Sequence, residues 1–320
     1  MMKKTLVALA AVAATGGAMA QAVMTGYIAV GYDSETSSAG ATSSGMGLDD
    51  AEINFAVSED IEGLGKLSGS MGFGSGGRGD AAAGNDTTLK LTTASGAAIT
   101  MGTTKGGSYL TQGLASAGTA YQWNLSGKLF SSRTINDSIS IKIPVMDGVS
   151  VSVAHSEAAV SSYWTGSGAT GNGTEQRYNT VSLDYASGPL AVNAGYRSYD
   201  NTVDSSSSSA NTRNRVSASY DLGAVKLGLG YESTQYMAGN AKSDSLFSMN
   251  APLSGALNIG VQMGQQSTTG GTTDYNRNGS LLVANYNLSK QTYLVANYYS
   301  YDAGSTQNAT GYGVFLYKGF

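Results

Sequence analysis

The sequence has no cysteine, only three prolines and only one histidine among its 320 residues. Without cysteine the chain forms no disulfide bonds and carries no thiol chemistry. The single histidine, His155, excludes metal sites that need several histidine ligands. Beyond residue 20 the chain also lacks an apolar run of about 18 residues, the length that a membrane-spanning helix needs. These absences exclude a disulfide-stapled protein and a helical membrane protein.

Lysine and arginine are also scarce. The chain has 18 of them against 22 acidic residues, and Lys3 and Lys4 lie at the N-terminus. Residues 21–320 therefore carry 18 − 2 = 16 basic and 22 acidic residues, a formal net charge of −6. This balance excludes a broad basic surface, so we expect no nucleic-acid partner.

The first twenty residues have the features of a secretory signal peptide. Two lysines form the charged region, Leu6–Ala14 the short apolar region, and Ala18-Met19-Ala20 the small-residue cleavage site. No linker divides the rest of the chain. We therefore expect a signal peptide at 1–20 and a single barrel domain at 21–320.

Glycine and tyrosine are abundant, with 44 and 20 residues, and both suit strands joined by tight turns. Apolar and polar residues alternate in several segments, as where Val149, Val151 and Val153 oppose Ser150 and Ser152. Seven short turns alternate with eight longer polar loops, an order that predicts sixteen strands. The turns lie near 59–65, 95–96, 145–148, 187–189, 222–223, 253–255 and 287–290, and the loops at 34–46, 75–85, 105–134, 159–174, 200–211, 235–241, 266–277 and 302–309.

Short turns at one end of the strands and long loops at the other are typical of outer-membrane barrels. The predicted fold is all-β: a transmembrane antiparallel β-barrel of sixteen strands with short periplasmic turns and long extracellular loops. Tyrosines near both strand ends agree with this, because amphipathic rings favour membrane–water interfaces. The last strand, with Tyr312, Val314, Leu316 and Phe320 on one face, is expected to pair with the first and close the barrel.

A barrel of sixteen strands encloses an aqueous channel. The inward positions are small and polar, as at Ser68, Ser70 and Thr88. The segment 105–134, here called the long loop, is expected to fold into the lumen and form its narrowest section. The alternatives are an external flap and a contact with a neighbouring subunit. Its aromatic residues are Tyr109, Tyr121, Trp123 and Phe130.

Inward charges are expected to set ion selectivity, because a low-dielectric pore wall focuses electric fields. Inward bases outnumber inward acids, so a mildly basic lumen is predicted; pairing of these charges along the wall is the alternative. Further inward acids are Asp50, Asp184, Asp221 and Glu232. The candidates for lining the pore or its constriction are Glu52, Lys66, Lys90, Lys105, Tyr109, Tyr121, Trp123, Lys128, Arg133, Lys142, Arg197, Arg213, Arg215 and Lys226.

Short segments of the chain resemble the general porins of Gram-negative bacteria, most of all the betaproteobacterial branch. They are Phe55-Ala-Val-Ser-Glu-Asp-Ile-Glu-Gly-Leu-Gly-Lys66, Tyr185-Ala-Ser-Gly-Pro-Leu190, Tyr220-Asp-Leu-Gly-Ala-Val-Lys-Leu227 and Tyr286-Asn-Leu-Ser-Lys-Gln-Thr292. The final Phe320 is similar to the assembly signal of that family. The resemblance implies a homotrimer in the outer membrane, in contact with lipid and lipopolysaccharide and assembled by the barrel-assembly machinery through its C-terminal strand. It also implies passive diffusion of small hydrophilic solutes through each pore.

The chain departs from the family pattern at three positions. Glu52 and Thr103 stand where the family usually has arginine, and Ala56 stands where it has a second basic residue. The long loop is commonly acidic in the family, whereas here it contains no acid. The usual field between a basic wall and an acidic loop is therefore not expected in the same form.

We expect no enzymatic activity, cofactor or metal. The one histidine has Val153 and Glu157 two residues away on its face, so no nucleophilic serine lies beside it locally. Two alternatives to a general diffusion channel stay open. The aromatic long loop favours a channel specific for a sugar or an anion, and the acidic outer loops favour a barrel acting mainly as an adhesin or envelope anchor.

Overall fold

The computed structural model describes residues 22–75, 83–105, 110–119, 124–131, 135–158, 176–200, 209–271, 274–304 and 307–320. The expected signal peptide at 1–20 lies outside these residues. Within them, one short 3-10 helix, η1 (Gly113–Ser116), belongs to the long loop. No helix among the described residues is long and apolar enough to cross a membrane.

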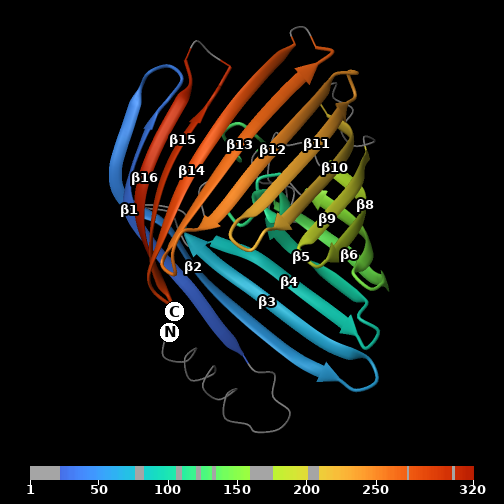
Figure 1. The fold of residues 1–320 in the computed structure, drawn as a ribbon. Coiled ribbons are helices and arrows are strands. Elements are labelled where there is room, and N and C mark those ends of the chain that lie inside the picture. The colour runs from blue at the N-terminus through green and yellow to red at the C-terminus, as the bar shows by residue number, and fades with distance from the viewer. Residues whose placement is uncertain are drawn as a thin grey trace.

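The described residues form sixteen strands in one closed barrel, as predicted (Figure 1). Each strand pairs antiparallel with its neighbours in sequence, and β1 also pairs with β16. The strands are β1 (Val23–Thr36), β2 (Thr42–Ile61), β3 (Gly65–Ser75), β4 (Ala83–Thr93), β5 (Ala98–Lys105), β6 (Ile135–Met146), β7 (Val149–Ala158), β8 (Gln176–Ser187), β9 (Leu190–Asp200), β10 (Ala210–Asp221), β11 (Lys226–Tyr236), β12 (Ala241–Pro252), β13 (Leu257–Thr269), β14 (Tyr275–Ser289), β15 (Thr292–Tyr301) and β16 (Ala309–Gly319).

The predicted turns lie between the strands where expected, but the loop predicted at 34–46 is much shorter. β1 continues to Thr36 and β2 begins at Thr42, with Ser34 paired to Ser44. The sequence is rich in serine and glycine there, which hid the strand pattern. The paired hairpin still satisfies its backbone groups through the ladder, so no long polar loop forms.

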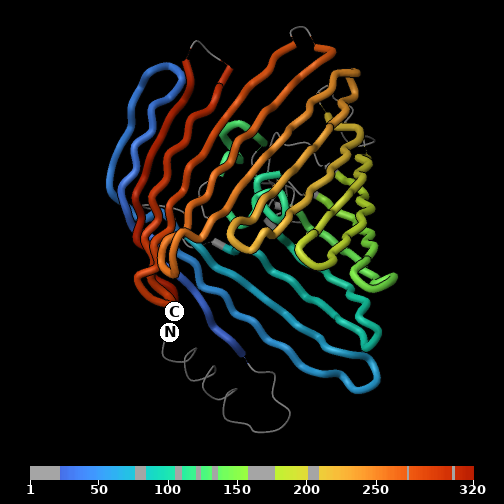
Figure 2. Tube along the Cα trace, in the orientation of Figure 1, coloured from blue at the N-terminus to red at the C-terminus, as the bar shows by residue number. Residues whose placement is uncertain are grey.

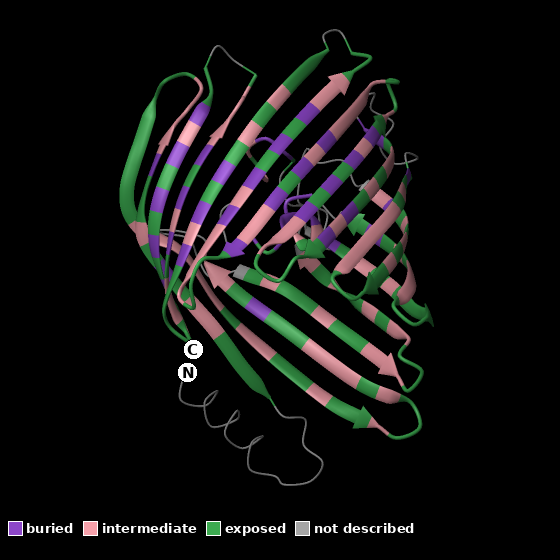
Figure 3. Ribbon diagram, viewed as in Figure 1, coloured by how far each residue is buried: buried purple, intermediate pink, exposed green. Residues whose placement is uncertain are grey.

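Alternation of side chains gives the barrel an apolar outer face. Ile139, Ile141 and Ile143 on β6 are all exposed and point away from the lumen. On β11 to β14, buried and exposed residues alternate along each strand (Figure 3). Exposed tyrosines lie near the turn ends of the strands, as at Tyr185, and near the loop ends, as at Tyr298. This is the distribution that a bilayer-spanning barrel requires.

Strands β1 and β16 close the barrel over a continuous ladder from Tyr27–Gly319 to Thr36–Thr310. Phe320 extends it, because its N–H donates to the Gly26 carbonyl at 3.0 Å and its carbonyl accepts from the Gly26 N–H at 3.2 Å. The phenyl ring lies over Gly26, where a Cβ would be 2.5 Å from the ring Cζ. The prediction of closure by the last strand is confirmed.

We therefore predict that Phe320→Ala, or deletion of Phe320, lowers the yield of folded barrel more than Lys318→Tyr does. Phe320 contributes two backbone hydrogen bonds and a ring contact to the closing seam, whereas Lys318 is on the outward face. The unheated, folded band on a denaturing gel measures the yield. A deletion variant that folds as well as the parent would contradict this role.

Candidate functional site

The described parts of the long loop, 110–119 and 124–131, lie inside the barrel against the inner faces of β11 to β16 (Figure 2). Five of their side chains belong to one buried apolar cluster with side chains from the strands. The loop contributes Leu110, Ala115, Leu125, Leu129 and Phe130, and the strands contribute Ala29, Leu246, Leu281, Val283, Val295, Tyr299, Phe315 and Tyr317. The barrel's apolar core therefore lies between the long loop and one side of the wall.

Glycines on the inner wall make room for this packing. A Cβ at Gly230 would lie 2.7 Å from both Leu110 and Ala115. At Gly264 it would lie 2.6 Å from the ring of Phe130. Any larger residue at either position would push the loop away from the wall, because a core at native density has no spare volume.

Buried hydrogen bonds fix the long loop on the same wall. Gln262, which is fully buried, donates through Nε2 to Thr119 Oγ1 at 2.8 Å. Gln266 Nε2 donates to the Leu129 carbonyl at 2.9 Å, and Ser248 Oγ donates to the Ala115 carbonyl. Since an unpaired buried polar group costs about 1–3 kcal/mol, these bonds hold the loop in one position. The described parts of the loop are neither an external flap nor extended toward a neighbour.

Lys128 is the charged residue in the described part of the long loop. Its Nζ lies 4.4 Å from the centroid of the Tyr299 ring. Burial lowers the pKa of Lys128, and the nearby carboxylates of Glu35 and Asp33 oppose that effect. The ammonium group thus faces the loop end of β1, where both acids lie.

The arginines of β9 and β10 line the inner wall around one carboxylate. Glu232 on β11 is 6% exposed, accepts a hydrogen bond from Arg215 Nε at 2.7 Å and forms an ion pair with Arg213, whose Nε lies 3.3 Å from Glu232 Oε1. Arg197 stacks on Tyr178, with 3.8 Å between its guanidinium carbon and the ring centroid. The buried acid and the ring hold these bases in position. Glu232 offsets one of their three positive charges, so this part of the wall stays basic.

Two lysines on the inner wall form ion pairs as well. Lys142 Nζ lies 2.8 Å from Asp184 Oδ2, and Asn193 donates to the same carboxylate. Lys242 Nζ lies 3.4 Å from Asp244 Oδ2. The alternative of charges that pair along the wall therefore describes much of this lumen.

The acids of β2 contact neutral donors instead. Asp50 accepts a hydrogen bond from the Tyr27 hydroxyl at 2.7 Å. Glu52 accepts from Asn85 Nδ2 at 2.8 Å and also from Asn54. A register shift in β2 directs Asp49 inward too, where the Tyr317 hydroxyl donates to it at 2.7 Å.

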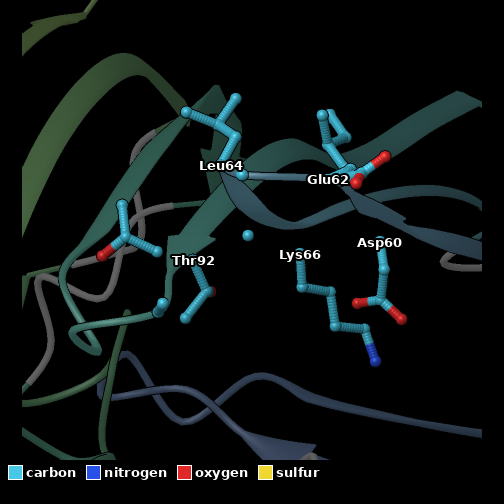
Figure 4. A pocket seen from close by; sticks show the side chains of 10 residues that line it. Asp60, Glu62, Leu64, Lys66 and Thr92 are labelled. Atoms are coloured by element: carbon cyan, nitrogen blue, oxygen red, sulfur yellow. The ribbon is translucent and has the colours of Figure 1, made fainter.

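Lys66, Lys90 and Lys226 lie toward the turn ends of their strands. Lys66 pairs in register with Asp60, and the two side chains lie side by side at a pocket between the β2–β3 and β4–β5 turns (Figure 4). Lys226 pairs in register with Asp221. These lysines are at the turn mouth of the barrel. Lys226 lies beside the long loop, because it is two residues from Gly228, where a Cβ would be 2.6 Å from the Ala115 carbonyl oxygen.

Some predicted site residues lie outside the described residues, namely Tyr109, Tyr121, Trp123 and Arg133; Lys105 is the last residue of β5. Sequence reasoning missed Lys242 and Asp244, although both share the inward face of β12 with the buried Leu246. It also missed Gln262 and Gln266, whose burial depends on a loop far away in sequence. Asp49 was not predictable from alternation, because the register shift reverses its face.

His155 lies on the exposed outer face, with Nδ1 2.9 Å from Asn179 Oδ1 and Nε2 3.4 Å from Glu157 Oε1. In the part of the chain that the structure describes, no group of three or more histidine, cysteine, aspartate or glutamate residues is placed to hold a metal ion.

A closed sixteen-stranded barrel with an inward-folded loop is the architecture of an outer-membrane channel. The profile of the Gram-negative porin family matches residues 5–306 of this sequence. The chain belongs to that family. It is an outer-membrane porin, a non-enzymatic channel for passive diffusion.

Solved structures share the fold at low sequence identity. The anion-selective porin from Comamonas acidovorans has a TM-score of 0.70 at 16% identity, covering 94% of this chain and 100% of that chain. OmpF of Salmonella typhi in complex with daunomycin has a TM-score of 0.74 at 14% identity, with 94% and 98% covered. The trimer form of OmpT from Vibrio cholerae has a TM-score of 0.67 at 10% identity, with 94% and 99% covered. No curated protein matches the chain.

Gln262→Leu is predicted to loosen the long loop, because it removes the buried hydrogen bond to Thr119 while keeping most of the side-chain volume. We expect noisier single-channel currents and a loss of about 1–3 kcal/mol in stability. Gln265→Leu is the matched control, since Gln265 is exposed on the outer face of the same strand. Equally quiet currents and equal stability in both variants would contradict the role of Gln262.

Proposed function

We propose that this porin is a general diffusion channel for small hydrophilic solutes and ions, without a binding site for one solute. The main support is the packing of the described parts of the long loop, whose buried contacts are with strands on one side of the barrel, among them β11 to β16. The inner wall of β3 and β4 carries small polar side chains such as Ser68, Ser70 and Thr88, where Ser70 and Thr88 hydrogen bond to each other at 2.8 Å. Such a surface stays hydrated and offers no specific pocket.

The alternative of a sugar- or anion-specific channel has less support among the described residues. A sugar channel needs ring faces open to the lumen, yet Tyr178 and Tyr199 are 6% and 8% exposed, and Arg197 covers the ring of Tyr178. An anion channel needs a wall with a positive net charge, whereas Glu232 offsets one of the two charges of Arg213 and Arg215, and Asp50 and Glu52 add negative charge. An adhesin or anchor would need no polar lumen at all.

We further propose that the protein is exported by the signal peptide at 1–20 and assembles as a homotrimer in contact with lipid and lipopolysaccharide. The exposed apolar outer face gives lipid and neighbouring subunits a surface to cover. Entry to the barrel-assembly machinery through the C-terminal strand, and membership of the betaproteobacterial branch, rest on the resemblance of Phe320 and the turn segments to that group. The trimer form of OmpT is consistent with three chains per particle.

In planar bilayers we expect the purified protein to give conductance steps that rise linearly with salt concentration. In liposomes we expect swelling rates for uncharged solutes that fall smoothly with solute size, because diffusion of a neutral solute through a hydrated pore depends chiefly on its size. Light scattering in detergent is expected to give the mass of three chains. Absence of conductance would contradict the channel, and saturable flux blocked by one sugar or anion would favour a solute-specific channel instead.

A further inference from the structure

We propose that Asp50 and Glu52 are specificity-determining residues, which make the inner wall of β1 and β2 anionic and give the pore a preference for cations. This inference rests on the proposed function as a diffusion channel. It differs from the mildly basic lumen that the sequence alone predicts.

No lysine or arginine occurs between Lys4 and Lys66, so β1 and β2 contain none. All their charged residues are acidic. Those facing the lumen between the loop end and the middle of the strands are Asp33, Glu35, Asp49, Asp50 and Glu52.

The donors to Asp50 and Glu52 are Tyr27, Asn54 and Asn85, all of them neutral. Across the described ranges, no lysine or arginine forms an ion pair with Asp50 or Glu52. Neutral donors orient a carboxylate but do not cancel its charge. Lys128 partly compensates Asp33 and Glu35, so Asp50 and Glu52 carry the inference.

The bases on the opposite side of the lumen belong to β9 and β10. In a ring of sixteen strands, β9 and β10 lie eight positions from β1 and β2, on the opposite side of the lumen. Their Arg197, Arg213 and Arg215 carry three positive charges, and the buried Glu232 offsets one of them. The two that remain are fewer than the five lumen-facing acidic charges of β1 and β2, of which Lys128 offsets one. The side of β1 and β2 is therefore the more strongly charged among the described residues.

Lys90 is a base on the nearby strand β4, but it lies too far from Glu52 to offset its charge. It pairs in register with Ser68, which pairs with Ser58. Ser58 is 58 − 52 = 6 residues from Glu52 along β2, or about 20 Å. That distance exceeds the Debye length of about 10 Å at 0.1 M salt. Lys90 thus leaves the charge of Glu52 in place at physiological ionic strength.

The consequence for permeation is electrostatic. A low-dielectric wall focuses the field of fixed charges into the lumen, which raises the local concentration of counter-ions. The favoured solutes are small monovalent and organic cations. The effect weakens at high salt, because mobile ions screen the wall.

The test is the reversal potential across a bilayer with a KCl gradient, which gives the ratio of K⁺ to Cl⁻ permeability. We expect the parent protein to favour K⁺, and Asp50→Asn with Glu52→Gln to lower the ratio at least about twofold. The matched control is Glu59→Gln, which removes the same charge from the exposed outer face of β2 and is expected to leave the ratio unchanged.

Glu52→Lys extends the series and is expected to lower the ratio further than Glu52→Gln. The unheated band on a denaturing gel shows that each variant is folded. A parent pore that favours Cl⁻, or a ratio that the double variant leaves unchanged, would overturn the inference while the diffusion channel stands. A folded parent protein without conductance would overturn the proposed function itself.

Discussion

Closure of the sheet is the constraint on which the rest of this structure depends. A bilayer offers no water to pair with backbone N–H and C=O groups, so a spanning sheet is stable only when every strand has two partners. Here each described strand has them, because β16 pairs with β1 and Phe320 hydrogen bonds to Gly26. Closure gives the sheet an inner and an outer face. Because side chains alternate between the two faces along each strand, apolar residues lie on the outer face and small or charged residues on the inner face. The polar lumen is thus a direct result of the closed ladder.

The described parts of the long loop pack against one side of that lumen. Glycines such as Gly230 and Gly264 let the loop approach β11 to β14, and buried amides such as Gln262 hold it there. The charges also differ around the ring. Glu232 offsets one of the positive charges of the arginines on β9 and β10, whereas the acids of β2 have neutral donors. A passive channel needs only this: a rigid wall, a hydrated path and fixed charges that bias which ions enter.

Much of the fold was predictable because it depends on local signals. Turn residues separate the strands, and their strict alternation with longer loops gave the strand number and the closing pair. The β1–β2 hairpin was misjudged, since serine and glycine near Ser44 carry no alternation. The site was less accessible to sequence reasoning, because burial of Gln262 and pairing of Arg213 with Glu232 depend on contacts between distant segments. At a register shift, the alternation of residues along a strand no longer tells which side chains face the lumen. Asp49 was missed for this reason.

The central claim is that the long loop is a fixed part of the inner wall. The chain has no cysteine, so a single introduced pair can test it without competing thiols. A Cβ at Gly260 would lie 3.0 Å from the Cβ of Thr119, close to disulfide range. The decisive measurement is single-channel conductance of the Thr119→Cys and Gly260→Cys double variant, oxidised and reduced. The structure predicts that the disulfide forms and that both states conduct equally. Failure of the bond to form, or a conductance that changes on reduction, would contradict the claim.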